Sequence, residues 1–436
     1  MSLKRAWAEI AGTLENACAS GKITAASLAL TTGDELHAVA AGMANQPEGV
    51  SATTDTLFHI GSVTKAMTAE IIWNLAEQRK LSVDWSAAEA APELARISGL
   101  DDPRLTLRHL LSHTSGLDSD IVFDAGLGPD VLRNFFGKVD RIGALFDPGQ
   151  HFSYSNVGYG VLGRVAELAG GAPFEEQLAS LLRNQHGLTH FAIHPADKIR
   201  QQTAVLFHDG QPVLFGPCSS IASGTLLAMS MSDLVRWGAS HASGKLTSTS
   251  LMRAAAITLP HNHRYEGWGN GFALMDNLGA GLFGHDGGTA GTGTFLRICE
   301  QATWAMSATG PGAIGVYREI EPMLRAALEL APSRRQGVLQ ELPGPLDVYE
   351  GVYSRHGADY AVSKSDDGGL IVTASGTMVA PMSLSLRSLS ARVWEAILPG
   401  LGLSIWVSFH AFDAQGRPGL ISVFERMARR REGHAA

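Results

Sequence analysis

The sequence predicts an α+β domain over residues 1–332, built on one antiparallel sheet, followed by a small all-β domain over residues 340–436. The chain has 436 residues, which is more than one ordinary hydrophobic core accommodates. Strand-like segments stand at both ends of a mostly helical middle, so the two ends are expected to meet in one sheet. Beyond the polar stretch 331–337, a plausible linker, short alternating segments follow at the close spacing typical of a small sheet or barrel.

The individual elements follow from hydrophobic periodicity. Near the start, Trp7, Ile10, Leu14 and Ala17 recur at helical spacing and predict an amphipathic helix. A second helix is expected over 62–79, where apolar residues again recur every four positions. The remaining expected elements are strands at 25–30, 37–41, 272–274, 294–298 and 304–308, a helix at 319–330, and in the second domain strands at 349–352, 360–363, 369–374, 383–388, 405–412 and 420–425.

The charge balance argues against nucleic acid as a partner. The chain has 34 Lys and Arg against 42 Asp and Glu, a formal net charge of −8, whereas nucleic-acid binding depends on clustered cations. One basic run lies near the end of the chain, and we interpret it as a solvated tail. It consists of Arg426, Arg429, Arg430 and Arg431.

Three scattered cysteines, Cys18, Cys218 and Cys299, are too few for a disulfide framework and suit a reducing compartment. Charged side chains interrupt residues 3–10, so no secretory signal is expected there. No apolar run approaches the ~20 residues that a membrane span needs, and the nearest, 396–409, contains Pro and Gly. We therefore expect a cytoplasmic protein with no membrane partner.

The first candidate for catalysis is Ser62-Val63-Thr64-Lys65, because Ser and Lys three positions apart project from one face of a helix. A neutral lysine amine can accept the serine proton if burial lowers its pKa. The start of the helix also adds partial positive charge where an oxyanion would develop. The alternative is a serine that caps the helix, with a lysine on the surface.

The second candidate is Tyr154-Ser155-Asn156, where a phenol near an amine could relay a proton and an amide could bind substrate or the lysine. Taken in isolation, this segment is better interpreted as a polar turn that opens a helix. The glycines at 158, 160 and 163 match a dinucleotide fingerprint. We reject that interpretation because a polar turn, and not a hydrophobic strand, precedes them.

The third candidate is the glycine-rich run 284–293, which includes His285-Asp286-Gly287-Gly288. Glycines allow a ligand to approach the backbone closely, and exposed N–H groups there could stabilise an oxyanion. A phosphate-binding loop would need a lysine, which the run lacks. The alternative is a glycine-rich turn with a histidine in solvent.

Four other histidines are not expected to take part in catalysis or metal binding. His261 and His263 have the spacing of possible metal ligands, but nothing around them supports a metal site. For His109 and His113, structural hydrogen bonding is the expected role. We expect neither a metal nor an organic cofactor.

The three motifs occur in an order that resembles the serine β-lactamase and penicillin-binding-protein-like hydrolases, in the branch of class C β-lactamases, D-aminopeptidases and family VIII esterases. Supporting segments are 110–117 and 230–234, and the resemblance covers about residues 5–330. It implies a β-lactamase/transpeptidase-like domain, with helices on both faces of an antiparallel sheet and a helical subdomain. The β-rich tail is similar to the C-terminal barrel appended to some members.

Carried over by position, the resemblance implies that Ser62 is the acylated nucleophile, that Lys65 activates it and that Tyr154 is the general acid or base. Asn156 would orient Lys65 or the acyl side chain. The backbone N–H groups of Ser62 and Gly288 would form the oxyanion hole. Gly287 and Gly288 would contact substrate together with His285, which stands where many members carry the Lys of a Lys-Thr-Gly motif.

The histidine at position 285 narrows the expected substrate. A lysine there would supply a permanent cation for a substrate carboxylate, whereas a neutral histidine supplies little charge, and Asp286 adds negative charge. We therefore expect a small acyl substrate, an ester or small amide. A D-amino-acid peptidase or β-lactamase, an acyltransferase and a non-catalytic binding protein of the same fold are the alternatives, and the oligomeric state is left open.

Overall fold

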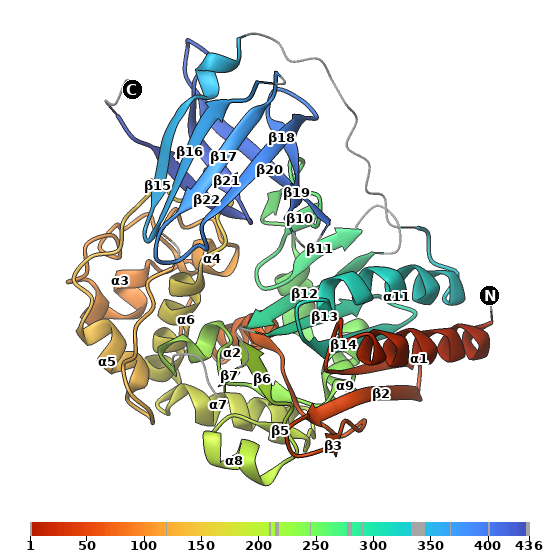
Figure 1. Cartoon of the computed structure of the whole chain (residues 1–436). Coiled ribbons are helices and arrows are strands. Elements are labelled where there is room, and N and C mark those ends of the chain that lie inside the picture. Colours follow the sequence, from red (N-terminus) through yellow and green to blue (C-terminus); the bar gives the residue numbers. More distant parts are fainter. Residues whose placement is uncertain are drawn as a thin grey trace.

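A computed structural model describes residues 2–118, 120–208, 211–213, 218–244, 246–276, 281–289, 291–332, 345–366, 368–399 and 402–432 (Figure 1). Most of the predicted linker, from residue 333 onward, lies outside the described residues, as does the expected start of the second domain at residue 340. Below, residues 2–332 are called the main domain and residues 351–430 the barrel.

The main domain is built on one antiparallel sheet in the order β3-β2-β1-β14-β13-β12-β11-β10-β9. Strand β1 pairs with β2 on one side and with β14 on the other, with Leu28 opposite both Val39 and Met306. This confirms the prediction that strands from both ends of the helical middle form one sheet. The strands are β1 (Ala25–Thr32), β2 (Glu35–Asn45), β3 (Val50–Ser51), β9 (Ile257–Thr258), β10 (Gly267–Trp268), β11 (Ala273–Asp276), β12 (Leu282–Thr289), β13 (Thr292–Ile298) and β14 (Thr303–Thr309).

Helices cover both faces of this sheet, as expected (Figure 1). Alternate side chains of β1 point to opposite faces of the sheet, and both sets are buried because helices cover both faces. Ala26, Leu28 and Leu30 pack under α1 and α11, while Ala25 and Ala29 belong to the core beneath α2 and α9. The helices are α1 (Leu3–Ala19), α2 (Thr64–Glu77), α3 (Ala87–Ala90), α4 (Leu107–Leu111), α5 (Val131–Gly137), α6 (Asn156–Gly170), α7 (Phe174–Ser180), α8 (Pro195–Arg200), α9 (Met231–Ala242), α10 (Thr247–Arg253) and α11 (Ala313–Ala327).

A helical subdomain formed by α3 to α7 lies beside the sheet (Figure 1). Its long helix α6 begins where the Ser155 hydroxyl accepts a hydrogen bond from the backbone N–H of Gly158, and it ends at Gly171 in the left-handed conformation. The capping serine therefore fixes the start of the helix beside Tyr154 and Asn156. Two small sheets complete the main domain, formed by β4 (Phe58–His59), β8 (Ala228–Met229) and β5 (Phe191–Ala192), and by β6 (Leu206–His208) and β7 (Gln211–Val213).

The C-terminal part forms a closed antiparallel barrel, β15 to β22, around a core that includes Tyr353, Trp394 and Phe409. Alternation of buried and exposed residues along strands such as β17 explains why the sequence pattern predicted strands here. The strands are β15 (Gly351–Arg355), β16 (Ala358–Lys364), β17 (Leu370–Ser375), β18 (Met382–Ser388), β19 (Val393–Leu398), β20 (Leu403–Phe412), β21 (Pro418–Val423) and β22 (Arg426–Arg430).

Three expectations about elements were wrong or incomplete. The helix expected at 319–330 spans Ala313–Ala327, because Ala313, Val316 and Tyr317 continue its buried face toward the sheet. Strands β3, β9, β10 and β12 of the main sheet and strands β19 and β22 of the barrel were not predicted. The basic run is not a solvated tail, because β22 pairs with β15 and β21 and closes the barrel.

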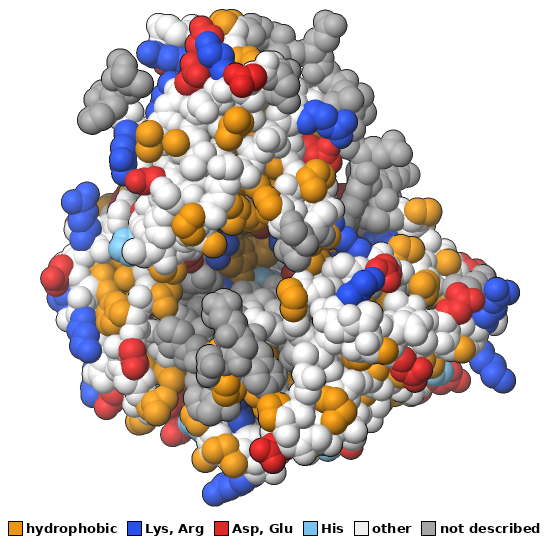
Figure 2. Space-filling view, in the orientation of Figure 1, with side chains coloured by type: hydrophobic (Ala, Val, Ile, Leu, Met, Phe, Trp, Pro, Cys, Tyr) orange, Lys and Arg blue, Asp and Glu red, His pale blue; other side chains and the backbone are white. Residues whose placement is uncertain are grey.

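The barrel docks on the main domain through an apolar contact and several hydrogen bonds. Leu145 and Phe146 form a buried cluster with Leu420 and Met427 of the barrel. The molecule is hollowed where the two parts meet, and basic and histidine side chains lie within the hollow (Figure 2). Among the described residues, no helix is both long enough and apolar enough to cross a membrane.

Candidate active site

Ser62 lies half-buried in a 3₁₀ turn, Gly61–Val63, that continues directly into α2. Gly61 has φ of 54°, a left-handed conformation that favours glycine. A Cβ atom on Gly61 would lie 2.6 Å from the amide nitrogen of Gly288, and one on Gly287 would overlap the carbonyl oxygen of Ile60. The turn that carries Ser62 therefore packs directly against the Gly287–Gly288 segment of β12.

Lys65 is fully buried one helical turn after Ser62. Its Nζ lies 3.2 Å from the Ser62 hydroxyl, 2.8 Å from Asn156 Oδ1 and 2.6 Å from the Ser223 carbonyl oxygen. Burial and the nearby Arg426 guanidinium hold the pKa of Lys65 well below its usual 10.5, and the Asp120 carboxylate opposes them only in part. An amine in this environment can be neutral and accept a proton.

Tyr154 covers the lysine, with its ring centroid 4.8 Å from Lys65 Nζ. Burial raises the pKa of Tyr154 above its usual 10.0, although the nearby Ser62 side chain opposes the rise in part. The phenol is thus protonated in neutral solution and suited to donate a proton. The backbone N–H of Tyr154 donates to the carbonyl oxygen of Glu425 at 2.9 Å, so a hydrogen bond from the main domain to the barrel positions Tyr154.

His285 is buried beside this group, with its ring centroid 6.1 Å from that of Tyr154. Burial and the proximity of Lys65 lower the pKa of His285 to about 3, so the ring is neutral at pH 7, as expected. Because a carbonyl oxygen only accepts, His285 Nδ1 carries the proton that it donates to the Asp286 carbonyl oxygen at 2.6 Å. The alternative of a histidine in solvent is wrong.

Asp286 does not add a free negative charge to the site, contrary to expectation. Its carboxylate accepts hydrogen bonds from Arg297 Nη1 at 2.5 Å and Arg264 Nη2 at 2.6 Å. Burial alone would raise the pKa of Asp286, but these two guanidinium groups lower it far below 3.8. The carboxylate is ionised and its charge is compensated.

The backbone N–H groups of Ser62 and Gly288 lie close to each other. Ser62 begins the first turn of a helix, where backbone N–H groups have no intrahelical partner. The crowding of Gly61 against Gly288 brings the Gly288 amide next to this turn. Backbone N–H groups that point at one position beside a serine hydroxyl can stabilise the charge of a tetrahedral intermediate.

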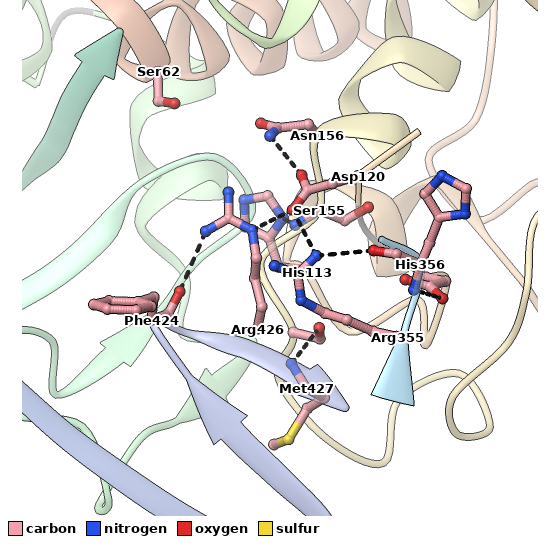
Figure 3. A network of polar contacts seen from close by, with 12 residues as sticks. Ser62, His113, Asp120, Ser155, Asn156, Arg355, His356, Phe424, Arg426 and Met427 are labelled. Atoms are coloured by element: carbon pink, nitrogen blue, oxygen red, sulfur yellow. Dashed lines mark hydrogen bonds and ion pairs between the residues drawn. The ribbon is translucent and has the colours of Figure 1, made fainter. Parts of the chain in front are cut away.

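Three charged residues at the site were missed by the sequence analysis, namely Asp120, Arg355 and Arg426 (Figure 3). Asp120 Oδ2 accepts from Arg426 Nε at 2.6 Å and from Arg355 Nη1 at 3.2 Å. The Arg426 guanidinium also lies 5.3 Å from the centroid of the Tyr154 ring. No local signal marks these residues, because Asp120 and Arg426 are 306 positions apart.

Of the four histidines that were not expected to take part in catalysis or metal binding, two make structural hydrogen bonds and the other two line a cavity. His109 Nδ1 accepts from the Thr106 N–H at 3.2 Å, and His113 Nδ1 accepts from the Ser155 N–H at 3.0 Å, which confirms structural hydrogen bonding. His261 and His263 line a cavity of about 320 Å³ between the main domain and the barrel. Among the described residues, no group of three or more His, Cys, Asp or Glu could hold a metal ion.

Comparison with known proteins settles the family. The Beta-lactamase family model matches residues 10–328. This chain belongs to the Beta-lactamase family. The resemblance that the three motifs indicated is therefore confirmed, and so is the β-lactamase/transpeptidase-like fold followed by a barrel.

The names of similar proteins point to different activities. Penicillin-binding protein 4 of Amycolatopsis lactamdurans is 28% identical over 359 residues, which cover 77% of this chain and 94% of that protein. Esterase EstB of Burkholderia gladioli is 30% identical over 204 residues, or 44% of this chain and 51% of the esterase. The crystal structure of SurE has a TM-score of 0.76 and 25% identity over 98% of this chain and 99% of that one.

Proposed function

We propose that this protein is a serine hydrolase that forms a covalent acyl-enzyme on Ser62 and acts on esters or small amides. The observation that carries the proposal is the buried Lys65 amine, 3.2 Å from the Ser62 hydroxyl, with a depressed pKa. A serine is a weak nucleophile until a neighbouring base accepts its proton. Family membership supports the proposal, because the relatives include an esterase and a penicillin-binding protein.

In the proposed reaction, Ser62 Oγ attacks the substrate carbonyl carbon while its proton moves to Lys65 Nζ. The backbone N–H groups of Ser62 and Gly288 stabilise the oxyanion of the tetrahedral intermediate. The carbon–leaving-group bond then breaks as Tyr154 donates its proton to the leaving group and regains one from Lys65. Water repeats the sequence on the acyl-enzyme: it loses its proton to the same pair, and Ser62 leaves with a proton.

A labelling experiment tests this function. A fluorophosphonate forms a phosphonate ester with an activated serine and releases fluoride, so intact-mass analysis should show one adduct on the parent and none on Ser62→Ala. Ser115→Ala is a suitable control, because Ser115 is a buried serine whose hydroxyl accepts from the backbone of Leu117. No adduct on the parent, or an adduct that persists in Ser62→Ala, would refute the proposal.

A second candidate, a D-amino-acid peptidase or amidase, is favoured by one observation. Arg426 brings a positive charge to the site from the barrel, and its side chain is 24% exposed. A substrate carboxylate could pair with this charge, although position 285 has a neutral histidine in place of a lysine. SurE, which is 25% identical over nearly the whole chain, has been crystallised with D-Leu.

Matched substrates separate the two candidates. We would compare pairs of amides of one D-amino acid, one with a free carboxylate on the leaving group and the other with the carboxylate esterified. A lower KM for the free carboxylate favours the peptidase, whereas turnover of simple esters with no preference within the pairs favours the esterase.

We also propose a cytoplasmic location, on the chemistry of the cysteines. Cys18, Cys218 and Cys299 are all free thiols, and two of them are buried. Burial raises the pKa of the Cys299 thiol, which makes it unreactive. Unpaired thiols of this kind suit a reducing compartment.

A further inference from the structure

Asp120 connects the barrel to the candidate catalytic residues, and only 5% of its surface is exposed. One carboxylate oxygen, Oδ1, accepts from Asn156 Nδ2 at 2.8 Å. The other, Oδ2, accepts from Arg426 Nε and Arg355 Nη1, which belong to the barrel strands β22 and β15. Figure 3 shows these groups converging on Asp120, with Ser62 on the other side of Asn156.

The contact with Asp120 fixes which way the Asn156 amide points. A carboxylate only accepts hydrogen bonds, so the amide NH₂ of Asn156 must face it. The amide oxygen of Asn156 then faces the other way, 2.8 Å from Lys65 Nζ. The reverse orientation would place two acceptors together at Asp120 and a donor against Lys65.

This orientation determines where the lone pair of a neutral Lys65 amine points. Such an amine has two N–H bonds and one lone pair, and Nζ has three polar neighbours. Two of them, Asn156 Oδ1 and the Ser223 carbonyl oxygen, can only accept and so take the two N–H bonds. The lone pair is left for the third neighbour, the Ser62 hydroxyl.

We propose that Asp120 is a positioning residue of the catalytic site, which the barrel arginines Arg355 and Arg426 hold in place and which directs the lone pair of Lys65 at Ser62 through Asn156. The inference rests on the proposed acyl-enzyme function. It makes the barrel a necessary part of the catalytic site, although no barrel residue takes part in bond making.

The charges around Lys65 fit this arrangement. Asp120 alone would favour the protonated lysine, and Arg426 opposes it from the barrel. The other ionisable groups that face Lys65 carry no charge in neutral solution. They are Tyr154 and Tyr159, whose pKa values burial raises, and His113 and His285, whose pKa values burial and Lys65 lower.

The replacement Asp120→Asn tests the positioning directly. The two arginines require an oxygen, so the new amide nitrogen would face Asn156 and turn its amide around. Lys65 would then meet an N–H donor that takes its lone pair away from Ser62. We expect fluorophosphonate labelling of Ser62 to slow by ~10²-fold, the lower range for loss of general-base help.

The double replacement Asp120→Asn with Asn156→Asp exchanges the two groups and should restore an acceptor next to Lys65. It also places a carboxylate in contact with the lysine, which raises the lysine pKa by ~1 or more. Labelling should therefore recover in alkaline solution, with the acid limb of its pH profile shifted upward by ~1 pH unit or more. A purely structural role for Asp120 would give no such shifted recovery.

The matched control is Asp118→Asn. Asp118 lies on the same loop and accepts from the His356 N–H of the barrel. Because this contact ties the loop to the barrel without altering the carboxylate of Asp120, labelling should stay within ~3-fold of the parent and keep its pH profile.

Three results would overturn the proposal: a folded Asp120→Asn labelled within ~3-fold of the parent, a double variant no faster than the single one at any pH, or a double variant with the parental acid limb. If Asp120→Asn does not fold, the acid limb of the double variant decides. Failure of the proposed function looks different, because neither the parent nor Asp118→Asn would then be labelled at Ser62.

Discussion

An exposed lysine is protonated at pH 7 and cannot accept a proton from serine. Lys65 differs because its side chain is fully buried and lies near Arg426, and both facts disfavour the ammonium form. The same burial keeps Tyr154 protonated, since it disfavours the phenolate. One buried environment thus favours a neutral amine and a neutral phenol side by side, which is the arrangement that the proposed acyl transfer needs.

Replacing Lys65 by Met should therefore slow labelling of Ser62 by ~10²–10⁴-fold, the contribution of general-base catalysis. The rate constant for fluorophosphonate labelling measures the effect, and circular dichroism confirms that the variant is folded. Lys80→Met removes an exposed lysine just beyond the end of the same helix and should leave the rate unchanged. Labelling of Lys65→Met at the parental rate would exclude Lys65 as the base.

The pH dependence of labelling follows from the same pKa shifts. Below its pKa, Lys65 carries a proton and cannot accept another, so the rate should rise with pH and reach half its maximum well below pH 10.5. Because burial raises the pKa of Tyr154, no loss from its ionisation is expected up to pH 10.0. A half-maximum at pH 10 or above would contradict a depressed lysine pKa.

At this scale the sequence could identify only residues in local motifs. Ser62 and Lys65 share one helical turn, and Tyr154 and Asn156 lie two positions apart where α6 begins. Such local motifs made them candidates, and the order of the motifs, through the family resemblance, suggested their roles. Asp120, Arg355 and Arg426 come from three distant segments that only the folded chain brings together. An arginine in a basic run is usually solvated, and its sequence does not show that it reaches into another domain.

Among the elements, the turn Gly61–Val63 and strand β12 depend on each other. The turn approaches β12 so closely that neither Gly61 nor Gly287 has room for a side chain. Hydrophobic periodicity predicted a helix here but could not show this approach. The glycine-rich run predicted a close approach of a ligand and not of the Ser62 turn, and one of its members, Ala290, lies outside the described residues.

Gly61→Ala should lower the labelling rate by ~10²-fold or more, because the new methyl group would displace the Gly288 amide from the oxyanion site. Gly33→Ala is a close control. Gly33 has φ of 59° against 54° for Gly61, but a Cβ atom there meets open space. Gly33→Ala should lose ~1 kcal/mol of stability in urea unfolding, and Gly61→Ala should lose more, because its methyl group also displaces the backbone of Gly288. Only Gly61→Ala should lose activity. Equal labelling rates would show that the crowding does not shape the site.

The hairpin of β21 and β22 explains why the end of the chain was the hardest element to predict. Met427 and Ala428 are buried, but the flanking arginines conceal the strand pattern. At its tip, Phe424 and Glu425 have φ of 51° and 61°. Two consecutive residues with positive φ are typical of a tight two-residue hairpin turn. Such strain in non-glycine residues is tolerated where the surrounding contacts enforce it, and here the Glu425 carbonyl holds Tyr154.

For the whole molecule, the sequence indicated two parts but not how they meet. The sheet and most barrel strands were predictable because burial on one or both faces leaves a periodic pattern. The docking of the barrel on the main domain leaves no periodic pattern in the sequence, because it uses single residues from separate strands. We propose that the division between the two domains lies between residues 332 and 345, and that the barrel shapes the catalytic site.

Weakening the apolar contact between the main domain and the barrel should therefore lower the stability of the whole molecule. Leu420→Ala removes a buried side chain from the cluster with Leu145 and Phe146, which should cost ~2–5 kcal/mol of unfolding free energy. The control Ile397→Ala changes an exposed barrel residue and should stay within ~0.5 kcal/mol. Urea unfolding followed by fluorescence measures both. A loss below ~0.5 kcal/mol in Leu420→Ala would show that the contact does not stabilise the docked barrel.

The most direct test of the acyl-enzyme on Ser62 is the mass of the protein during turnover of a p-nitrophenyl ester, quenched in acid within milliseconds. The parent should gain the mass of the acyl group, and peptide mapping should locate it on Ser62, while Ser62→Ala should gain nothing. Turnover with no covalent adduct, or with the acyl group on another residue, would contradict the account.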